Sequence, residues 1–277
     1  MRKELGVTVV PISVHIDRTV FKDGSLDVEG LFERVAAART FPTTAAPSPG
    51  AFAAAFRSAA KTAESVLCIT LSSRISGTFD AAVKAAEVVQ LELPDLPLRV
   101  MDSRSLAIAE GFVVRSAARA ASQGADLAAA ATAAAGMINR VHLVGTLDTM
   151  RYLAKSGRVP WIVHWVSSAL QIKPVLVAQQ DGIRMLARVR TRGKAVERII
   201  MYARRLLAPG QVAHIAVMHS AAREEAETLA ERLRRDFDLG ELLVTEFTPV
   251  MGLHTGPGFL GLAFYSEGSD GNAERKV

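Results

Sequence analysis

The sequence predicts an α/β protein with two domains. Short apolar runs rich in β-branched residues alternate with longer segments of helical periodicity, which is typical of this class. A chain of 277 residues with 49% hydrophobic and 22% charged residues is long enough for two globular domains. The pattern changes after the apolar run 141–147. We therefore expect a domain over 1–145 with a mostly parallel sheet and flanking helices, and an α/β domain over 146–277 with a mixed or antiparallel sheet.

Helix caps and apolar runs predict the elements of the first domain. Asp27 can cap a helix that ends near Arg39, and Ser48 with Pro49 begins the next, because serine accepts hydrogen bonds from free amides and proline suits the first turn. The alanine-rich run 125–135 favours a packed helix, since alanine is the strongest helix former. The expected strands are 7–16, 65–71 and 98–101, and the expected helices are 27–39, 49–62, 77–89, 105–122 and 125–137.

The second domain contains a clear hairpin signal. Asp181-Gly182 lies between two segments with apolar residues, and this dipeptide is typical of an antiparallel hairpin turn. A short helix over 148–155 should close at Ser156-Gly157-Arg158. The remaining expected elements are strand 141–147, a hairpin beginning at Lys173, helix 193–207, strand 212–218, helix 221–236, strand 241–247 and strand 259–265.

Composition weighs against several classes of function. The net charge of +5 is a modest excess, and the aromatic residues, 6% of the chain, do not interleave with basic ones, so nucleic-acid binding is not expected. No apolar run reaches the roughly 18 residues of a membrane span, and the first five residues lack a secretory signal, so we expect a cytoplasmic protein without stable membrane insertion. Cys68 lies in an apolar run and should be buried packing.

Cofactor and metal motifs also give no support for a redox or metal-dependent enzyme. Paired cysteines, the HExxH motif and the Walker A motif are all missing from the sequence, so we expect no metal and no cofactor. The segment 256–261 formally matches the dinucleotide fingerprint G-x-G-x-x-G. Only 16 residues follow Gly261, however, which is too few for the helix, strand and acidic residue that the fingerprint requires.

Three segments rich in glycine and hydroxyl groups, 43–50, 72–78 and 252–261, are candidates for a binding site. Glycine lets a backbone approach a ligand closely, while hydroxyl groups and an imidazole can hold a small polar or anionic group. Ser76 and Asp102 follow predicted strands, and ligands of α/β proteins bind beyond the carboxyl ends of strands. We therefore expect one small polar or anionic group to bind where these segments meet.

Seven motifs occur in a fixed order: Thr44-x-x-Pro47-Ser48-Pro49-Gly50, Ser72-Ser73-x-x-Ser76-Gly77-Thr78, Asp102-Ser103, Gly157-Arg158, Lys173-Pro174, Arg188-Val189-Arg190-Thr191 and His254-Thr255-Gly256-Pro257-Gly258. Together they resemble the DegV family of fatty-acid-binding proteins from about residue 7 to residue 265. The resemblance implies a two-domain EDD-type fold with a long-chain fatty acid in a tunnel between the domains. It also implies a non-catalytic acyl-carrier subunit of fatty acid kinase, which presents the carboxylate to a separate ATP-dependent subunit in phospholipid metabolism.

The resemblance assigns the ligand-binding residues. By position Thr44 and Ser76 match the family's carboxylate-binding hydroxyl groups, His254 matches the histidine of the terminal turn, and Arg158 the arginine after the glycine turn. Their neighbours Gly77 and Thr255 complete the predicted set. Structural roles stay open beside these: Thr44 can shape a turn, Ser76 can cap a helix, and Arg158 can compensate a helix dipole.

A group of arginines suggests a docking surface. Arg184, Arg188, Arg190 and Arg192 occupy even positions of a predicted strand, and the period of two would place them on one face. Clustered arginines suit an acidic partner or the kinase subunit, so we expect Arg188, Arg190 and Arg192 to dock it. A solvated strand face is the alternative.

A serine hydrolase is the alternative enzymatic function. Ser76, His254 and Asp102 are the residue types of a catalytic triad, which occurs in any chain order. Ser76 lacks the surrounding Gly-x-Ser-x-Gly motif of a nucleophile elbow, which favours binding over catalysis.

Overall fold

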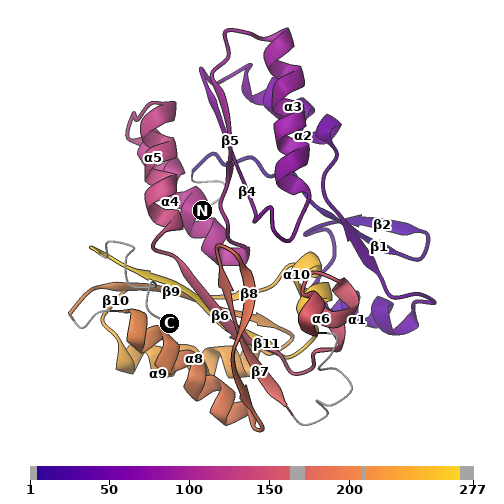
Figure 1. Cartoon of the computed structure of the whole chain (residues 1–277), viewed down its shortest axis with the longest axis vertical. Helices are drawn as coiled ribbons and strands as arrows, with labels where there is room; N and C mark the ends of the chain where they lie inside the picture. Colours follow the sequence, from indigo (N-terminus) through magenta and orange to yellow (C-terminus); the bar gives the residue numbers. More distant parts are fainter. Residues whose placement is uncertain (1–4, 163–171, 208–209, 269–277) are drawn as a thin grey trace. The chain divides into compact units, whose positions relative to one another are not determined.

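The computed structural model describes residues 5–162, 172–207 and 210–268 of the chain (Figure 1). They form two compact units, and neither unit is one continuous stretch. The first unit comprises Met1–Ser13 with Ala45–Asn139, and the second Val14–Thr44 with Arg140–Val277. The predicted division into 1–145 and 146–277 did not anticipate that residues 14–44 belong with the C-terminal part. They do so because their helix packs against a helix near residue 250.

The first unit contains a parallel pair of strands covered by helices. Strands β4 and β5 pair in parallel from Val66 opposite Leu98 to Thr70 opposite Asp102, as the predicted fold class requires. Helix α2 begins where the sequence predicts, with the Ser48 side chain accepting a hydrogen bond from the Ala51 amide. The bounds are β4 Val66–Thr70, β5 Leu98–Asp102, α2 Pro49–Ala59, α3 Thr78–Glu92, α4 Ala107–Ser122 and α5 Leu127–Ile138.

A mixed six-stranded sheet forms the centre of the second unit. The strand order is β10-β9-β11-β6-β7-β8, with β10 parallel to β9 and the other neighbours antiparallel. This confirms the predicted mixed sheet and the hairpin at Asp181-Gly182. The bounds are β6 His142–Thr146, β7 Lys173–Gln179, β8 Gly182–Val189, β9 Ala213–Ser220, β10 Leu239–Glu246 and β11 Phe259–Ser266.

Two amphipathic helices, α8 (Arg192–Leu206) and α9 (Arg223–Asp236), cover one face of this sheet (Figure 1). Their apolar sides pack with Val144, Ile215 and Phe264 of the sheet into one core, where burial of a large apolar side chain contributes about 1.5–3 kcal/mol. Among the described residues, none of the helices has the length and apolar character needed to cross a lipid bilayer.

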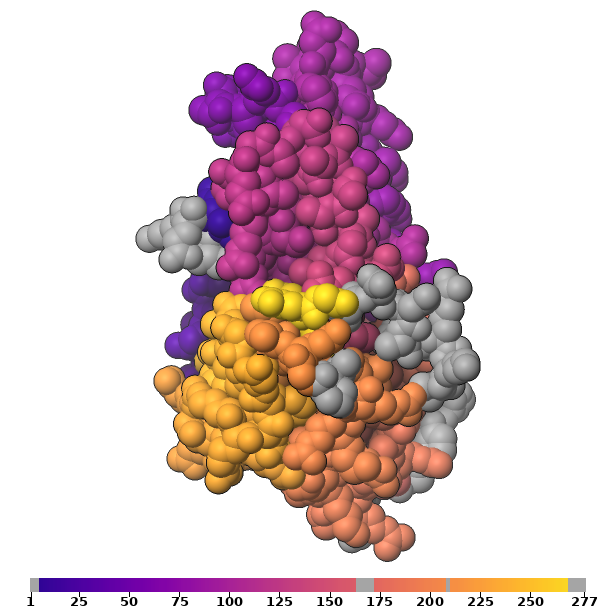
Figure 2. All heavy atoms as spheres, turned by 90° about the vertical axis from the view of Figure 1, so that its left-hand side faces the viewer, coloured from indigo at the N-terminus to yellow at the C-terminus, as the bar shows by residue number. Residues whose placement is uncertain are grey.

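Strand β11 lies in the interior of the sheet between β9 and β6, and all eight of its residues are buried. Such a continuous apolar run is expected for a strand covered on both faces. The chain comes to the surface directly after the strand, at the exposed residues Glu267 and Gly268, and the yellow end of the described chain is visible in Figure 2. There the Glu267 amide donates to the Val212 carbonyl oxygen at 3.0 Å.

Residues 13–45 contribute a small three-stranded sheet and one helix. The strand order is β2-β1-β3, with β1 Ser13–Ile16, β2 Thr19–Lys22 and β3 Thr43–Ala45. Helix α1, Val28–Ala37, begins at Asp27, whose side chain accepts from the Gly30 amide as predicted. The predicted strand 7–16 forms only over β1, because its first residues pair with no other strand of the described chain.

Helix α10, Pro249–Thr255, occupies a segment that the sequence pattern had indicated as a glycine-rich turn. It packs against α1 and against the short helix α6, Arg151–Ser156, and the three helices are seen together in Figure 1. Gly252 permits this packing, since a Cβ atom there would lie 3.3 Å from the Leu31 side chain. The helix therefore depends on tertiary contacts more than on its own sequence.

The predicted arginine stripe is not a single strand face. Strand β8 ends at Val189, so Arg190 lies beyond it, and Arg192 is the first residue of helix α8. A register shift also interrupts the strand: Ala187 pairs with Val175 but Met185 pairs with Leu176, which leaves Leu186 unpaired. An extra residue of this kind reverses the alternation of side chains. Arg184 and Arg188 therefore point to opposite faces of the sheet.

Candidate functional site

Three of the predicted site residues meet in the second unit. The hydroxyl oxygen of Thr44, on β3, lies 3.1 Å from Nε2 of His254 at the end of α10. The same oxygen accepts a hydrogen bond of 3.2 Å from Nη2 of Arg158, which follows α6. We call these three residues the Thr44 triad. They come from three separate elements, so the fold, and not sequence proximity, brings them together.

The end of helix α6 positions Arg158. Gly157 adopts the left-handed conformation with φ of 70°, which glycine adopts without strain and which ends the helix. The Ser156 hydroxyl donates to the Leu153 carbonyl oxygen and accepts from the Arg158 amide. Nη1 of Arg158 donates to the Ser156 carbonyl oxygen at 2.5 Å. Arg158 thus pairs a free carbonyl oxygen at the negative end of the helix dipole, which is the structural role left open for it. Its second terminal nitrogen, Nη2, donates to Thr44.

The imidazole of His254 is neutral at physiological pH. Burial lowers its pKa to about 4, and the positive charge of Arg158 acts in the same direction. The imidazole can therefore act as a hydrogen-bond donor to the ligand site but not as its cation. Arg158 is therefore the cation of the Thr44 triad.

Hydrogen-bond accounting shows what the Thr44 triad can bind. A threonine hydroxyl has two acceptor lone pairs and one hydrogen, and an arginine can only donate. Nδ1 of His254 is buried without a partner among the described residues. Unpaired buried N–H groups are rarer than unpaired acceptors, which favours the proton on Nε2. Both Arg158 and His254 then donate to Thr44, which leaves the hydroxyl hydrogen of Thr44 available for an acceptor outside the triad, such as a carboxylate oxygen.

Tyr152 of helix α6 is a site residue that the sequence did not reveal. Its ring lies between Phe32 and Phe41, with ring centroids 5.8 Å from each, in edge-to-face geometry. A Cβ atom on Gly256 would lie 2.5 Å from this ring, and Gly256 has a positive φ of 77°. The tyrosine therefore fixes the turn that follows His254. In the sequence, only Gly256, two residues after His254, gave a sign that a bulky side chain lies against this turn.

Thr255, also predicted to bind the ligand, has its hydroxyl engaged within the helix. The hydroxyl donates to the Met251 carbonyl oxygen at 2.9 Å, and the residue is buried. This back-bonding is common for threonine inside helices. The structure therefore does not bring Thr255 into the Thr44 triad.

Ser76 and Gly77 lie in the first unit, at the start of α3. The Ser76 hydroxyl lies 2.7 Å from the Thr78 hydroxyl and accepts from the Thr78 amide at 3.3 Å. The Ser76 hydroxyl thus satisfies the free amide of Thr78 at the first turn of α3, one residue before the N-cap position at which the sequence had left a capping role open for it. Gly77 is the N-cap residue and is exposed, and a Cβ atom at this position would meet no other atom within 4 Å.

Asp102 organises the loop between the ends of β4 and β5. Its carboxylate accepts from the Ser73 hydroxyl at 2.6 Å and from the Arg104 amide at 2.8 Å. A hydrolase would need aspartate bonded to histidine and histidine bonded to the nucleophile. Ser76 instead contacts Thr78, and Nε2 of His254 contacts Thr44. The serine hydrolase alternative is therefore not favoured.

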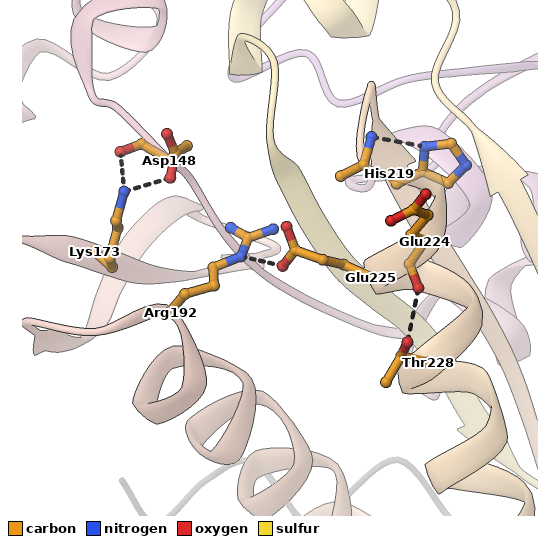
Figure 3. Close-up of polar contacts among 8 residues, drawn as sticks. Asp148, Lys173, Arg192, His219, Glu224, Glu225 and Thr228 are labelled. Atoms are coloured by element: carbon orange, nitrogen blue, oxygen red, sulfur yellow. Dashed lines mark hydrogen bonds and ion pairs between the residues drawn. The ribbon is translucent and has the colours of Figure 1, made fainter.

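The predicted docking arginines differ in how they are engaged. Arg192 forms an ion pair with Glu225 of α9, with Nε and Oε2 at 2.6 Å, as Figure 3 shows. Nearby, Lys173 pairs with the carboxylate of Asp148. Arg188 and Arg190 are exposed, and Arg190 makes no ion pair with the described residues. Arg190 is thus an exposed cation of the predicted set that has no ion-pair partner among the described residues.

Comparison with known sequences agrees with these features. The sequence model described as "Uncharacterised protein, DegV family" matches residues 1–267. A DegV domain-containing protein of Streptomyces coelicolor is 37% identical over 264 residues, which cover 94% of this chain and 92% of the relative. One from Mycobacterium tuberculosis is 32% identical over 269 residues, covering 95% and 91% respectively.

Solved structures show the same fold. A DegV family protein from Thermus thermophilus, described by its fatty acid binding, has a TM-score of 0.87 and 28% identity over 96% of this chain and 94% of its own. DegV of Bacillus subtilis, described as a fatty acid binding protein, has a TM-score of 0.86 and 27% identity over the same shares, 96% and 94%. The family match over nearly the whole chain, the fold and the order of the motifs agree: the chain belongs to the DegV family.

Proposed function

We propose that this protein binds a long-chain fatty acid, holds its carboxylate at the Thr44 triad and presents it to a separate ATP-dependent kinase subunit. The observation that carries the proposal is the shared Thr44 hydroxyl, which accepts from Arg158 and lies beside a neutral His254. One cation and one outward hydroxyl hydrogen match a single carboxylate group. The fatty acid binding described for the relatives from Thermus and Bacillus supports this ligand class.

Affinity and orientation come from different parts of the ligand. Each buried methylene contributes about 0.8 kcal/mol, so roughly 14 of them contribute on the order of 11 kcal/mol before association entropy is included. A hydrogen bond to a charged group contributes about 1.5–3 kcal/mol. The tail therefore determines most of the affinity, and the Thr44 triad determines where the carboxylate lies.

The proposed role is positioning without catalysis by this chain. The triad offers a guanidinium, a hydroxyl and an imidazole whose pKa of about 4 makes it a poor base at neutral pH. A carboxylate held by a few donors keeps one oxygen accessible to a phosphoryl donor on another protein, which is a task of orientation. That oxygen would then attack the γ-phosphorus of ATP on the kinase subunit, which forms the acyl-phosphate of the bound fatty acid and releases ADP.

Native mass spectrometry of protein purified from a heterologous host tests the ligand class. We expect a retained fatty acid, and a protein free of lipid that also fails to bind added oleate would contradict the proposal. Thr44→Val removes the hydroxyl at nearly constant volume and should weaken oleate binding about 10-fold to 100-fold. Thr132→Val is the matched control, because among the described residues its exposed hydroxyl donates only to the Ala128 carbonyl oxygen of the same helix.

Ser76 and Thr255 stay predictions to be tested in the same assay. Ser76→Ala removes a hydroxyl that the structure places in the first unit. A loss of oleate affinity comparable to that of Thr44→Val would support a second carboxylate contact. A loss only of thermal stability would assign Ser76 to capping α3, and the same comparison applies to Thr255→Val.

Kinase docking is tested separately through Arg190. Arg190→Glu should lower acyl-phosphate formation with a purified bacterial fatty acid kinase subunit and ATP, while oleate affinity stays unchanged. Arg198→Glu is the control, since it reverses an exposed charge on helix α8. Equal loss of both activities in Arg190→Glu, or an equal effect of Arg198→Glu on acyl-phosphate formation, would contradict a docking role.

A further inference from the structure

A cavity of about 390 Å³ lies in the second unit, where strands β9 and β10 end. Its polar lining consists of Glu29 of α1, His219 of β9, Glu246 of β10, and Arg223, Glu224 and Glu227 of α9. This volume is near the lower end of the range of about 300–1,000 Å³ found for ligand sites. We call it the acidic pocket, and it has room for one side chain or a small molecule.

The acidic pocket is negative on a chain that is positive overall. Four glutamates face one arginine in its lining, whereas the whole chain has a net charge of +5. Glu29, Glu224 and Glu227 are exposed and form no ion pair with the described residues. Carboxylates gathered around a concave surface concentrate a negative potential there. Arg223 and the N-terminal end of α9 offset part of it, so charge alone does not define the ligand.

His219 supplies a second and independent recognition element. Its side chain is only 5% exposed, and its Nδ1 accepts a hydrogen bond from the Ala222 amide, as Figure 3 shows. Burial lowers the pKa of His219, so the ring is neutral and its proton is on Nε2. No described residue accepts a hydrogen bond from Nε2, and the ring lines the acidic pocket. Nε2 therefore faces the open space of the acidic pocket, where it can donate a hydrogen bond to an acceptor of an occupant in place of water.

We propose that the acidic pocket receives an arginine side chain of a partner protein, with a backbone carbonyl oxygen of the same partner accepting from Nε2 of His219. A guanidinium pairs with several carboxylates at once through its fixed fork of donors. A peptide provides a cation and an acceptor a few ångströms apart, as this lining requires. A metal ion provides no acceptor, and the described residues contain no group of three or more His, Cys, Asp or Glu that could hold one. The inference does not depend on fatty acid binding.

The test uses the full-length protein, labelled with ¹⁵N, and two capped tripeptides. One is Gly-Arg-Gly, and the other carries citrulline, the neutral isostere of arginine. We expect millimolar binding of the arginine peptide, with chemical-shift changes at the His219 imidazole and at the amides of Ala221 and Arg223. The citrulline peptide should bind at least threefold more weakly, because it has the acceptor but lacks the charge.

Two sets of variants separate the pocket from the general surface charge. The double variant Glu224→Gln with Glu227→Gln should weaken binding of the arginine peptide about threefold to tenfold, since it removes two exposed carboxylates that would pair with the guanidinium. Glu231→Gln is the control, because Glu231 lies on the same helix but pairs with Arg234 outside the acidic pocket. Urea midpoints should match among all three proteins.

Several results would overturn the proposal. Equal binding of the citrulline and arginine peptides would remove the role of charge. Equal weakening by Glu231→Gln and by the double variant would assign binding to the surface in general. Stronger shifts of the same resonances with inorganic phosphate than with the arginine peptide would identify an anion site around Arg223.

Discussion

The clearest quantitative prediction concerns the dependence of stability on the protonation of His254. Its pKa is lowered from 6.5 to about 4 in the folded protein. Because the folded-state pKa is depressed, the contribution to stability is fully present above pH 6.5 and is lost as the pH falls toward 4. A shift of 2.5 units at about 1.36 kcal/mol per unit corresponds to about 3 kcal/mol. The change to make is His254→Gln, which keeps an N–H donor for Thr44 and does not titrate.

The assay is urea unfolding of lipid-free protein at several pH values between 4 and 7. Lipid must be removed because a bound carboxylate would add its own pH dependence. The free energy of unfolding of the wild type should fall by about 3 kcal/mol more than that of His254→Gln over this range. Titration of the His254 ring by NMR gives a direct check. Parallel pH profiles of the two proteins, or a ring that titrates near 6.5, would refute the reasoning.

Three further predictions concern other parts of the chain. Burial, with the nearby charge of Asp102, raises the pKa of Glu110 from 4.5 to about 8, so the contribution of protonated Glu110 to stability is present below pH 4.5 and is lost as the pH rises through 8. Glu110→Gln should therefore exceed the wild type by up to about 5 kcal/mol in unfolding free energy at pH 9, and equal stability of the two proteins there would contradict this. Gly256→Ala should lower the free energy of unfolding by at least about 2 kcal/mol in urea, because Gly256 has a positive φ of 77° and its Cβ would meet Tyr152. Gly77→Ala should lower it by less than about 1 kcal/mol, because no other atom lies near the added Cβ. Similar losses in the two variants would count against the steric argument. Burial raises the pKa of the Cys68 thiol to about 12, so iodoacetamide at pH 8 should label it only after unfolding, and rapid labelling of native protein would show that the thiol is accessible.

Elements that depend on neighbouring residues in the sequence could be predicted, and elements that depend on tertiary contacts could not. Asp27 and Ser48 cap their helices as expected, because capping depends on a few neighbouring residues. Helix α10 was missed because seven residues with an internal glycine carry little helical periodicity. The bulge at Leu186 depends on how β7 pairs with β8, and alternation in one strand cannot reveal it.

The candidate site shows the same division. Thr44 and His254 are 210 positions apart in the chain, so their spacing in the sequence gives no sign that they meet. Their association was predicted only from the family resemblance of the motifs that contain them. The neutral state of His254 and the wedge of Tyr152 against Gly256 depend on packing that only the folded chain reveals. The roles of Arg188, Arg190, Ser76 and Thr255 stay predictions.

The assignment of Val14–Thr44 to the second unit has a practical consequence for dissecting the protein. A fragment that starts at residue 140 would retain Arg158 and His254 but lose Thr44, and α10 would lose the neighbour that covers Gly252. Such a fragment should be poorly folded alone. Supplying residues 14–44 as a separate peptide should rescue it, in the manner of split-protein complementation, and would turn oleate binding into a reporter of fragment assembly.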